Sequence, residues 1–141
     1  MLNPCVILLV CIAFITALAQ DKPAPANPSG TSAVPSEAVQ VANPVKPTPE
    51  SLAQGKKYYG YDCVFCHGEH GDGKGEVAIS EKMNLKNWSD PAALSGMTDG
   101  ELFYIIKNGK GKMPPEGDRV KATELWNMVN YIRSFAKGKA Q

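Results

Sequence analysis

The sequence has little net charge, few cysteines and no long hydrophobic run. Its 15 basic and 14 acidic side chains give a formal charge of +1, without the positive bias that nucleic acid or anionic membrane surfaces select, so no nucleic-acid partner is expected. The longest apolar run, residues 6–18, is shorter than the roughly 20 residues that span a membrane. No segment shows the alternating pattern of a strand, which argues against a β fold.

Residues 1–19 are predicted to be a signal peptide. They carry no charged side chain, and their apolar run ends in Ala17-Leu18-Ala19, the small-x-small pattern that a signal peptidase accepts. Because no lysine or arginine precedes the run, an uncleaved membrane anchor stays open as an alternative. Either way, the rest of the chain is expected to be exported.

Residues 20–49 hold seven of the eleven prolines and no aromatic side chain. Since every proline lacks a backbone donor, this segment is expected to be a disordered, extended linker that forms no core. It could serve as a tether or be an uninvolved tail. The folded domain is therefore predicted to span residues 50–141.

Apolar residues at helical spacing predict three main helices in the folded domain, at about residues 50–59, 101–107 and 122–136. The second should be opened by a capping box that begins at Thr98. Four glycines within residues 68–90 favour turns rather than regular structure there. The side chains expected on the core side of the second and third helices are Leu102, Ile105, Ile106, Leu125, Met128, Val129 and Ile132.

Removal of the leader would leave only two cysteines, and both lie in Cys63-Val64-Phe65-Cys66-His67. Two thiols at this spacing can add to both vinyl groups of a haem, and the next residue then places its imidazole on the iron. A thioredoxin-like redox pair would need a strand before the motif. A structural zinc site would need four ligands, and only His70 could complete the set. Both alternatives fit less well than a covalent haem.

The side chains able to bind the iron opposite His67 are His70 and the methionines at positions 83, 97, 113 and 128. Met113 is favoured because its loop is made flexible by glycines and then stiffened by Pro114 and Pro115, so it can fold over a planar group. Met83 is the main rival. A thioether favours reduced iron more than a second imidazole would, which implies a comparatively high potential.

Together these motifs resemble the class I c-type cytochromes over nearly all of residues 51–137. The resemblance implies an all-α cytochrome c fold, in which three main helices and glycine-rich loops wrap one covalently bound haem c, with its iron held by His67 and Met113. It also implies a periplasmic location, or a membrane anchor facing the periplasm if the leader is retained. The residues that carry it are Gly55, Tyr59, Cys63, Cys66, His67, Gly68, Gly71, Gly73, Gly75, the segment 108–114, Met128, Tyr131 and Ile132.

Four further residues are candidates for a role near the haem. Trp88 lies where members of the resembled family often wrap the propionate edge, and its indole N–H could donate to a propionate, although plain packing is the alternative. Lys107, Lys110 and Lys112 flank Met113. They could form a docking patch, or simply a solvated loop.

The sequence thus predicts an exported, monomeric, single-haem electron carrier that is not an enzyme. Its partners are expected to be redox proteins, possible membrane-bound oxidoreductases among them, and it would touch a membrane only if the leader is retained. One alternative is a cytochrome subunit or tethered domain of a larger oxidoreductase. Another is a haem sensor or peroxidase, which would need an open sixth position on the iron.

Overall fold

The structure, a computed structural model, describes residues 33–137. The predicted signal peptide and the first part of the predicted linker lie outside the described residues. Within residues 33–137 the only β pairing is an isolated bridge between Lys110 and Met113, which confirms the all-α prediction. The elements are α1 (Ser36–Val39), α2 (Pro49–Asp62), α3 (Val64–His67), α4 (Glu76–Ser80), the 3-10 helix η1 (Pro91–Leu94), α5 (Asp99–Asn108) and α6 (Ala122–Phe135).

The three expected main helices are α2, α5 and α6. Thr48 caps α2, its side chain accepting the backbone N–H of Ser51 at 3.2 Å. Thr98 caps α5 in the same way, accepting the N–H of Glu101 at 3.1 Å. These caps satisfy backbone donors that a helix start leaves unpaired, and both helices run slightly beyond the range that the sequence predicts.

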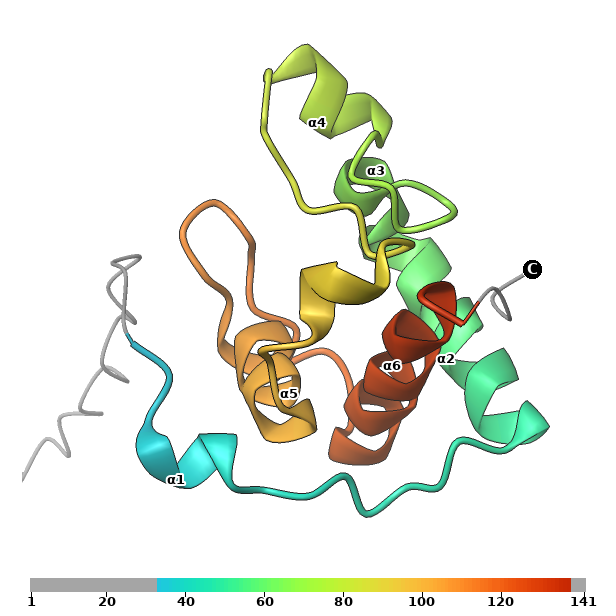
Figure 1. Cartoon of the computed structure of the whole chain (residues 1–141), viewed down its shortest axis with the longest axis vertical. Helices are drawn as coiled ribbons and strands as arrows, with labels where there is room; N and C mark the ends of the chain where they lie inside the picture. The colour runs from blue at the N-terminus through green and yellow to red at the C-terminus, as the bar shows by residue number, and fades with distance from the viewer. Residues whose placement is uncertain (1–32, 138–141) are drawn as a thin grey trace, which may run out of the picture.

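The crossing of α2 over α6 organises the domain (Figure 1). Gly55 lies at this crossing, where an added Cβ would stand 2.2 Å from the carbonyl oxygen of Asn127 and 2.7 Å from the Cβ of Tyr131. Only glycine therefore allows the two helix backbones to approach so closely. One turn later, Tyr59 is buried and packs edge-on against Tyr131 and Phe135, with ring centroids 5.3 and 5.4 Å apart.

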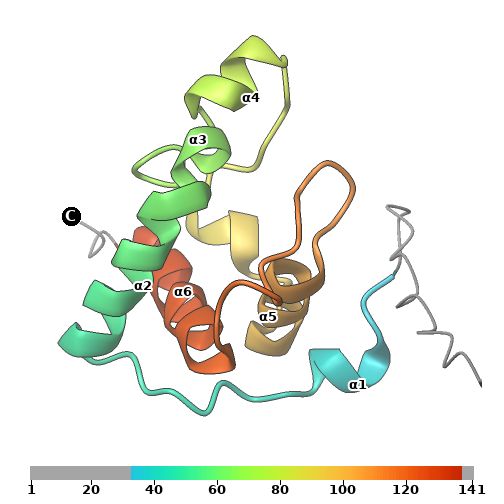
Figure 2. The same ribbon diagram turned by 180° about the vertical axis from the view of Figure 1, so that it is seen from behind.

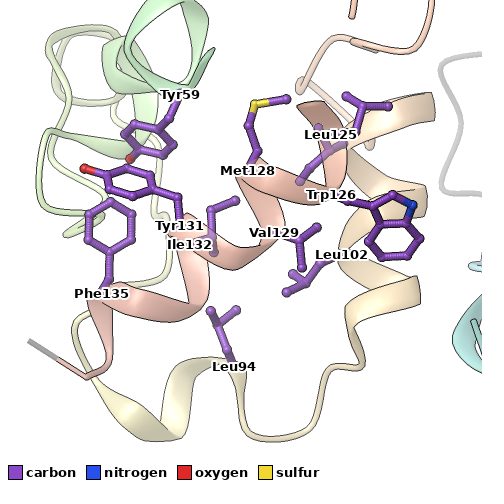
Figure 3. Packing of buried hydrophobic residues seen from close by; sticks show 11 residues of the cluster. Tyr59, Leu94, Leu102, Leu125, Trp126, Met128, Val129, Tyr131, Ile132 and Phe135 are labelled. Carbon is purple, nitrogen blue, oxygen red and sulfur yellow. The ribbon is translucent and has the colours of Figure 1, made fainter. Parts of the chain in front are cut away.

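The core lies on α6, which packs against both α2 and α5 (Figure 3). Leu125, Met128, Val129 and Ile132 are all buried, as the sequence predicts. Leu102 and Ile106 of α5 join them, whereas Ile105 is only half-buried. Each such large apolar side chain stabilises the fold by about 1.5–3 kcal/mol when it is fully buried.

The segment 68–90 contains a helix that the sequence analysis does not predict. Five residues form α4, which begins after Gly75 and packs against α3. An added Cβ on Gly75 would lie 2.4 Å from the carbonyl oxygen of Phe65, so the absence of a side chain lets the loop return against α3. The rest of the segment is irregular, as expected.

The described part of the predicted linker is ordered on the domain, which corrects the prediction of disorder for it. Residues 33–48, the N-terminal strap, include α1 and run beneath α5 and α6 (Figure 1). The Asn43 side-chain amide donates to Asn130 Oδ1 at 2.9 Å, and the Asn130 amide donates to the carbonyl of Val45 at 2.9 Å and to Ser51 Oγ at 2.9 Å. These long-range bonds, which composition does not reveal, hold the strap in place.

No helix within residues 33–137 is both long and apolar enough to cross a membrane.

Candidate functional site

The motif Cys63 to His67 sits where α2 passes into the single turn of α3. The backbone N–H of Cys63 donates to the carbonyl of Tyr59 at 3.0 Å, and that of His67 donates to the carbonyl of Cys63 at 2.8 Å. Cys63 and Cys66 are half-buried and not joined in a disulfide. The helical turn thus holds two free thiols and an imidazole close together in the chain.

The glycine-rich loop after His67 is fastened to this turn. The N–H of Gly73 donates to the carbonyl of His67 at 2.9 Å, and the N–H of Gly75 donates to the carbonyl of Cys66 at 3.1 Å. The hydroxyl of Tyr59 donates to the carbonyl of Gly68 at 2.6 Å. These bonds connect the loop to the buried α2–α6 crossing, so the turn that carries His67 has a rigid base.

The thiol of Cys63 is in its neutral form at ordinary pH. Burial, together with the carboxylates of Glu116 and Asp62, raises its pKa to about 12. A thioredoxin-type pair depends instead on a thiol whose pKa is lowered, because the thiolate is the nucleophile. The environment of Cys63 therefore argues against the redox-pair alternative.

The imidazole of His67 is also neutral, because burial lowers its pKa to about 4. Neutral imidazole is the form that binds metal. Its Nδ1 atom is buried and has no hydrogen-bond partner among the described residues. The ring lies against the indole of Trp88, with centroids 4.1 Å apart and an interplanar angle of 19°.

The loop between α5 and α6 carries Met113. Two backbone hydrogen bonds of 3.0 Å between Lys110 and Met113 close its tip. Figures 1 and 2 show that this loop rises from the core on the same side as α3 and α4. Met113 and Cys63 are both half-buried and pack against the same apolar core cluster.

The other candidate iron ligands are placed less favourably. Met128 is buried in the core with 1 % of its surface exposed, and His70 is exposed. Met97 packs against the core, and Met83 is half-buried in the long loop after α4. Met128 thus occupies the core position that its helical spacing predicts, while Met83 stays the rival of Met113 as a ligand.

One charged group near the motif is not anticipated from the sequence. Glu116 is buried, with 4 % of its surface exposed, and accepts two hydrogen bonds from Arg119 Nη2 at 2.7 and 2.6 Å. The same nitrogen donates to Asp62, the residue before Cys63, at 3.2 Å. Arg119 therefore links the loop that carries Met113 to the end of α2. In the sequence, the i, i+3 spacing of Glu116 and Arg119 is the signal that could have predicted this ion pair.

The residues present fit a covalently attached haem. The structure supplies two free thiols at the required spacing, an adjacent neutral imidazole with an unpartnered buried nitrogen, and a thioether in a closed loop. Within residues 33–137, no three His, Cys, Asp or Glu side chains gather as a metal ion would require, so the zinc alternative gains no support there. The three candidate docking lysines, Lys107, Lys110 and Lys112, are exposed.

Comparison with known proteins gives a family match over most of the folded part. The profile of the family described as "Cytochrome C oxidase, cbb3-type, subunit III" matches residues 50–132. The chain is 33 % identical over 113 residues to the cbb3-type cytochrome c oxidase subunit FixP of Bradyrhizobium sp. (strain ORS 278), which covers 74 % of this chain and 37 % of FixP. It thus spans little more than a third of that relative.

Two further similarities concern a shorter relative and a solved structure. Cytochrome c6 of Cladophora glomerata is 30 % identical over 83 residues, which are 59 % of this chain and 87 % of cytochrome c6. A chain of the Kuenenia stuttgartiensis reducing HAO-like protein complex Kustc0457/Kustc0458 aligns with a TM-score of 0.56 and 23 % identity, over 74 % of this chain and 50 % of that one. The latter shows a likeness of fold.

Proposed function

The chain belongs to the family described as cytochrome c oxidase, cbb3-type, subunit III, whose members are c-type cytochromes, and from this we propose that it is a single-haem carrier that passes electrons between exported or membrane-bound redox proteins. Because the chain belongs to this family, its cofactor is covalently bound haem c with its iron. The observation that carries the proposal is the packing of Cys63 and Met113, from two different elements, against one core cluster.

In this proposal Cys63 and Cys66 would hold the haem through thioether bonds, and His67 and Met113 would bind its iron. When bound, the haem supplies an iron that takes up and releases one electron at a time. The neutral state of His67 supports its role as a ligand, and the closed tip of the 109–113 loop supports that of Met113. With both ligands supplied by the chain, the haem could change oxidation state without gaining or losing a ligand.

The partners are proposed to dock on exposed apolar side chains next to the attachment motif. Phe65, between the two cysteines, is 51 % exposed, and Ile79 of α4 is 66 % exposed. Lys112 forms a 3.9 Å ion pair with Glu81, just after α4, so this lysine adjoins the apolar surface. Small redox interfaces of this kind commonly bury less than about 1,200 Å².

A second candidate is a cytochrome subunit of a larger oxidoreductase. It is favoured by the similarity to FixP, which its name describes as an oxidase subunit. The N-terminal strap supports either role, because it leads from the domain to the part of the chain where the predicted leader lies. If that leader is cleaved after Ala19, the carrier is free in the periplasm; if it is retained, the domain is anchored and faces the periplasm.

The binding of carbon monoxide to the reduced protein distinguishes a carrier from a sensor or peroxidase. The reduced protein should show a spectrum that carbon monoxide does not change, and the haem should titrate reversibly with one electron. Rapid binding of carbon monoxide would indicate an open sixth position and overturn the carrier proposal. Size-exclusion chromatography of the native protein distinguishes a free carrier from an oxidoreductase subunit. Elution at the mass of one chain supports the free carrier, whereas co-elution with a membrane oxidoreductase supports the subunit.

A further inference from the structure

The ring of Trp88 lies almost parallel to the imidazole of His67 and close to it. The centroids are 4.1 Å apart and the planes differ by 19°. The ring of Trp88 also stacks on that of Phe135, with centroids 6.5 Å apart and an interplanar angle of 30°. Offset stacking of this kind stabilises one arrangement of the rings beyond the effect of burying their area. Two planar neighbours therefore restrict the orientation of the indole, and the indole in turn restricts that of the imidazole.

Trp88 is itself held by the loop that follows His67. Its backbone N–H donates to the carbonyl of Gly71 at 2.7 Å. Gly71 packs so closely on Phe135 that an added Cβ would lie 2.7 Å from the ring, and Phe135 is 5 % exposed in the core. The position of the indole is thus fixed from α6 through the loop.

A histidine that binds a metal is usually oriented by a hydrogen bond from its second ring nitrogen to a carbonyl, a carboxylate or water. Such a bond also makes the imidazole a stronger electron donor to the metal. Nδ1 of His67 is buried and has no such partner within residues 33–137. Ring orientation must therefore come from another contact, and the stacked indole is the contact that the structure provides.

We propose that Trp88 is a positioning residue that orients His67 by stacking, in place of the usual hydrogen bond to Nδ1. The consequence is a less basic ligand to the iron, which favours the reduced state and raises the potential. This inference rests on the proposed ligation of the iron by His67. It gives Trp88 a role different from donation to a propionate, because stacking needs the ring and not the indole N–H.

The test compares Trp88→Phe, which keeps an aromatic ring but loses the N–H, with Trp88→Leu, which loses both. Trp126 offers a matched control, since it stacks on Phe103 at 4.0 Å and 18° on the α5–α6 side of the core. The readouts on the haem-loaded protein are the midpoint potential and the hyperfine-shifted haem-methyl resonances of the oxidised state, which report imidazole orientation. Neither readout depends on a partner or on turnover.

We expect Trp88→Phe to retain the wild-type potential and resonances. Trp88→Leu should shift the methyl resonances, because the imidazole is no longer held in one orientation, and Trp126→Leu should change neither readout. Equal changes in Trp88→Phe and Trp88→Leu would show that the N–H matters and overturn the inference in favour of a propionate contact. Wild-type behaviour in both Trp88 variants would overturn it as well.

A measurement on the wild-type protein covers the case in which Trp88→Leu does not fold. In the proton NMR spectrum of the reduced state, the Nδ1–H of His67 should have the chemical shift of a proton that makes no strong hydrogen bond. A resonance typical of a strong hydrogen bond to a carbonyl would overturn the inference. If instead His67→Ala leaves the wild-type haem spectrum unchanged, the proposed ligation has failed, which is distinct from a failure of the stacking.

Discussion

At the scale of single residues, the assignment of Met113 as the distal ligand makes the sharpest prediction. Met113→Ala should abolish the weak long-wavelength band of sulfur-to-iron charge transfer in the oxidised protein. It should also lower the potential, because a neutral thioether that favours reduced iron is removed. Since the iron then lacks one of its ligands, the reduced protein should bind carbon monoxide. Optical spectroscopy and a redox titration measure all three effects.

Met83→Ala is the matched control for this prediction, since Met83 is half-buried in the long loop and is the rival ligand. The control should keep the band and the potential. If Met83→Ala abolishes the band while Met113→Ala keeps it, the assignment of the distal ligand is wrong.

The residues of the site were predictable from the sequence to different degrees. Cys63, Cys66 and His67 are fixed by spacing within one helical turn, so a local pattern identifies them. The contact of Trp88 with His67 joins residues 21 positions apart and depends on the packing of Phe135. The buried Glu116 likewise depends on how its loop returns to α2. Such contacts are set by tertiary structure, which no local pattern contains.

At the scale of helices, α2 contains a test of the close crossing with α6. Gly55→Ala would place a Cβ 2.2 Å from the carbonyl of Asn127, whereas an added Cβ on Gly60, in the same helix, meets nothing within 4 Å. We expect Gly55→Ala to lower the free energy of unfolding by about 1–3 kcal/mol through overpacking. Gly60→Ala should raise it by up to about 1 kcal/mol, through helix propensity. Urea unfolding of both variants decides this, and equal effects would contradict the crossing.

The N-terminal strap leads to a second prediction at this scale. Asn43→Ala would leave Oδ1 of Asn130 without its donor and the N–H of Val45 without its acceptor. An unsatisfied buried polar group costs about 1–3 kcal/mol. The variant should therefore unfold at lower urea, and residues 33–48 should be cleaved faster by a protease. Asn84→Ala, at an exposed position, is the control; unchanged cleavage in Asn43→Ala would show that the strap is not held by this network.

The main helices were predictable because their caps and apolar spacing are local, as Thr48 and Thr98 illustrate. The strap was not, because its proline-rich composition predicts disorder while its order comes from side chains of α6 far along the chain. Helix α4 was missed since its five residues are too few to show a periodic pattern.

At the scale of the whole molecule, the near-zero net charge limits long-range attraction to any partner. Exposed charges are screened beyond about 8 Å at physiological ionic strength, so electron exchange with the natural partner should slow only modestly as salt is added. Replacing Lys107, Lys110 and Lys112 by glutamine should flatten this dependence without changing the haem spectrum. Replacement of Lys46, Lys56 and Lys57 by glutamine should leave the salt dependence of the rate unchanged. These three lysines are exposed on the strap and α2.

Stopped-flow rates at several salt concentrations give the comparison. A steep salt dependence that survives the replacement of Lys107, Lys110 and Lys112 would show that the partner docks on another face. Lys74, Lys82 and Lys86 of the segment 68–90, all exposed, would then be the next residues to replace.

Covalent attachment of one haem through Cys63 and Cys66 is the claim from which the rest of the account follows. Intact-mass spectrometry of the protein after extraction with acidified acetone tests it most directly. The account predicts that the pigment stays with the polypeptide, that the mass exceeds that of the chain by one haem, and that the increment disappears in the Cys63→Ser/Cys66→Ser variant. A wild-type protein that loses its colour to the solvent and shows the mass of the bare polypeptide would contradict it.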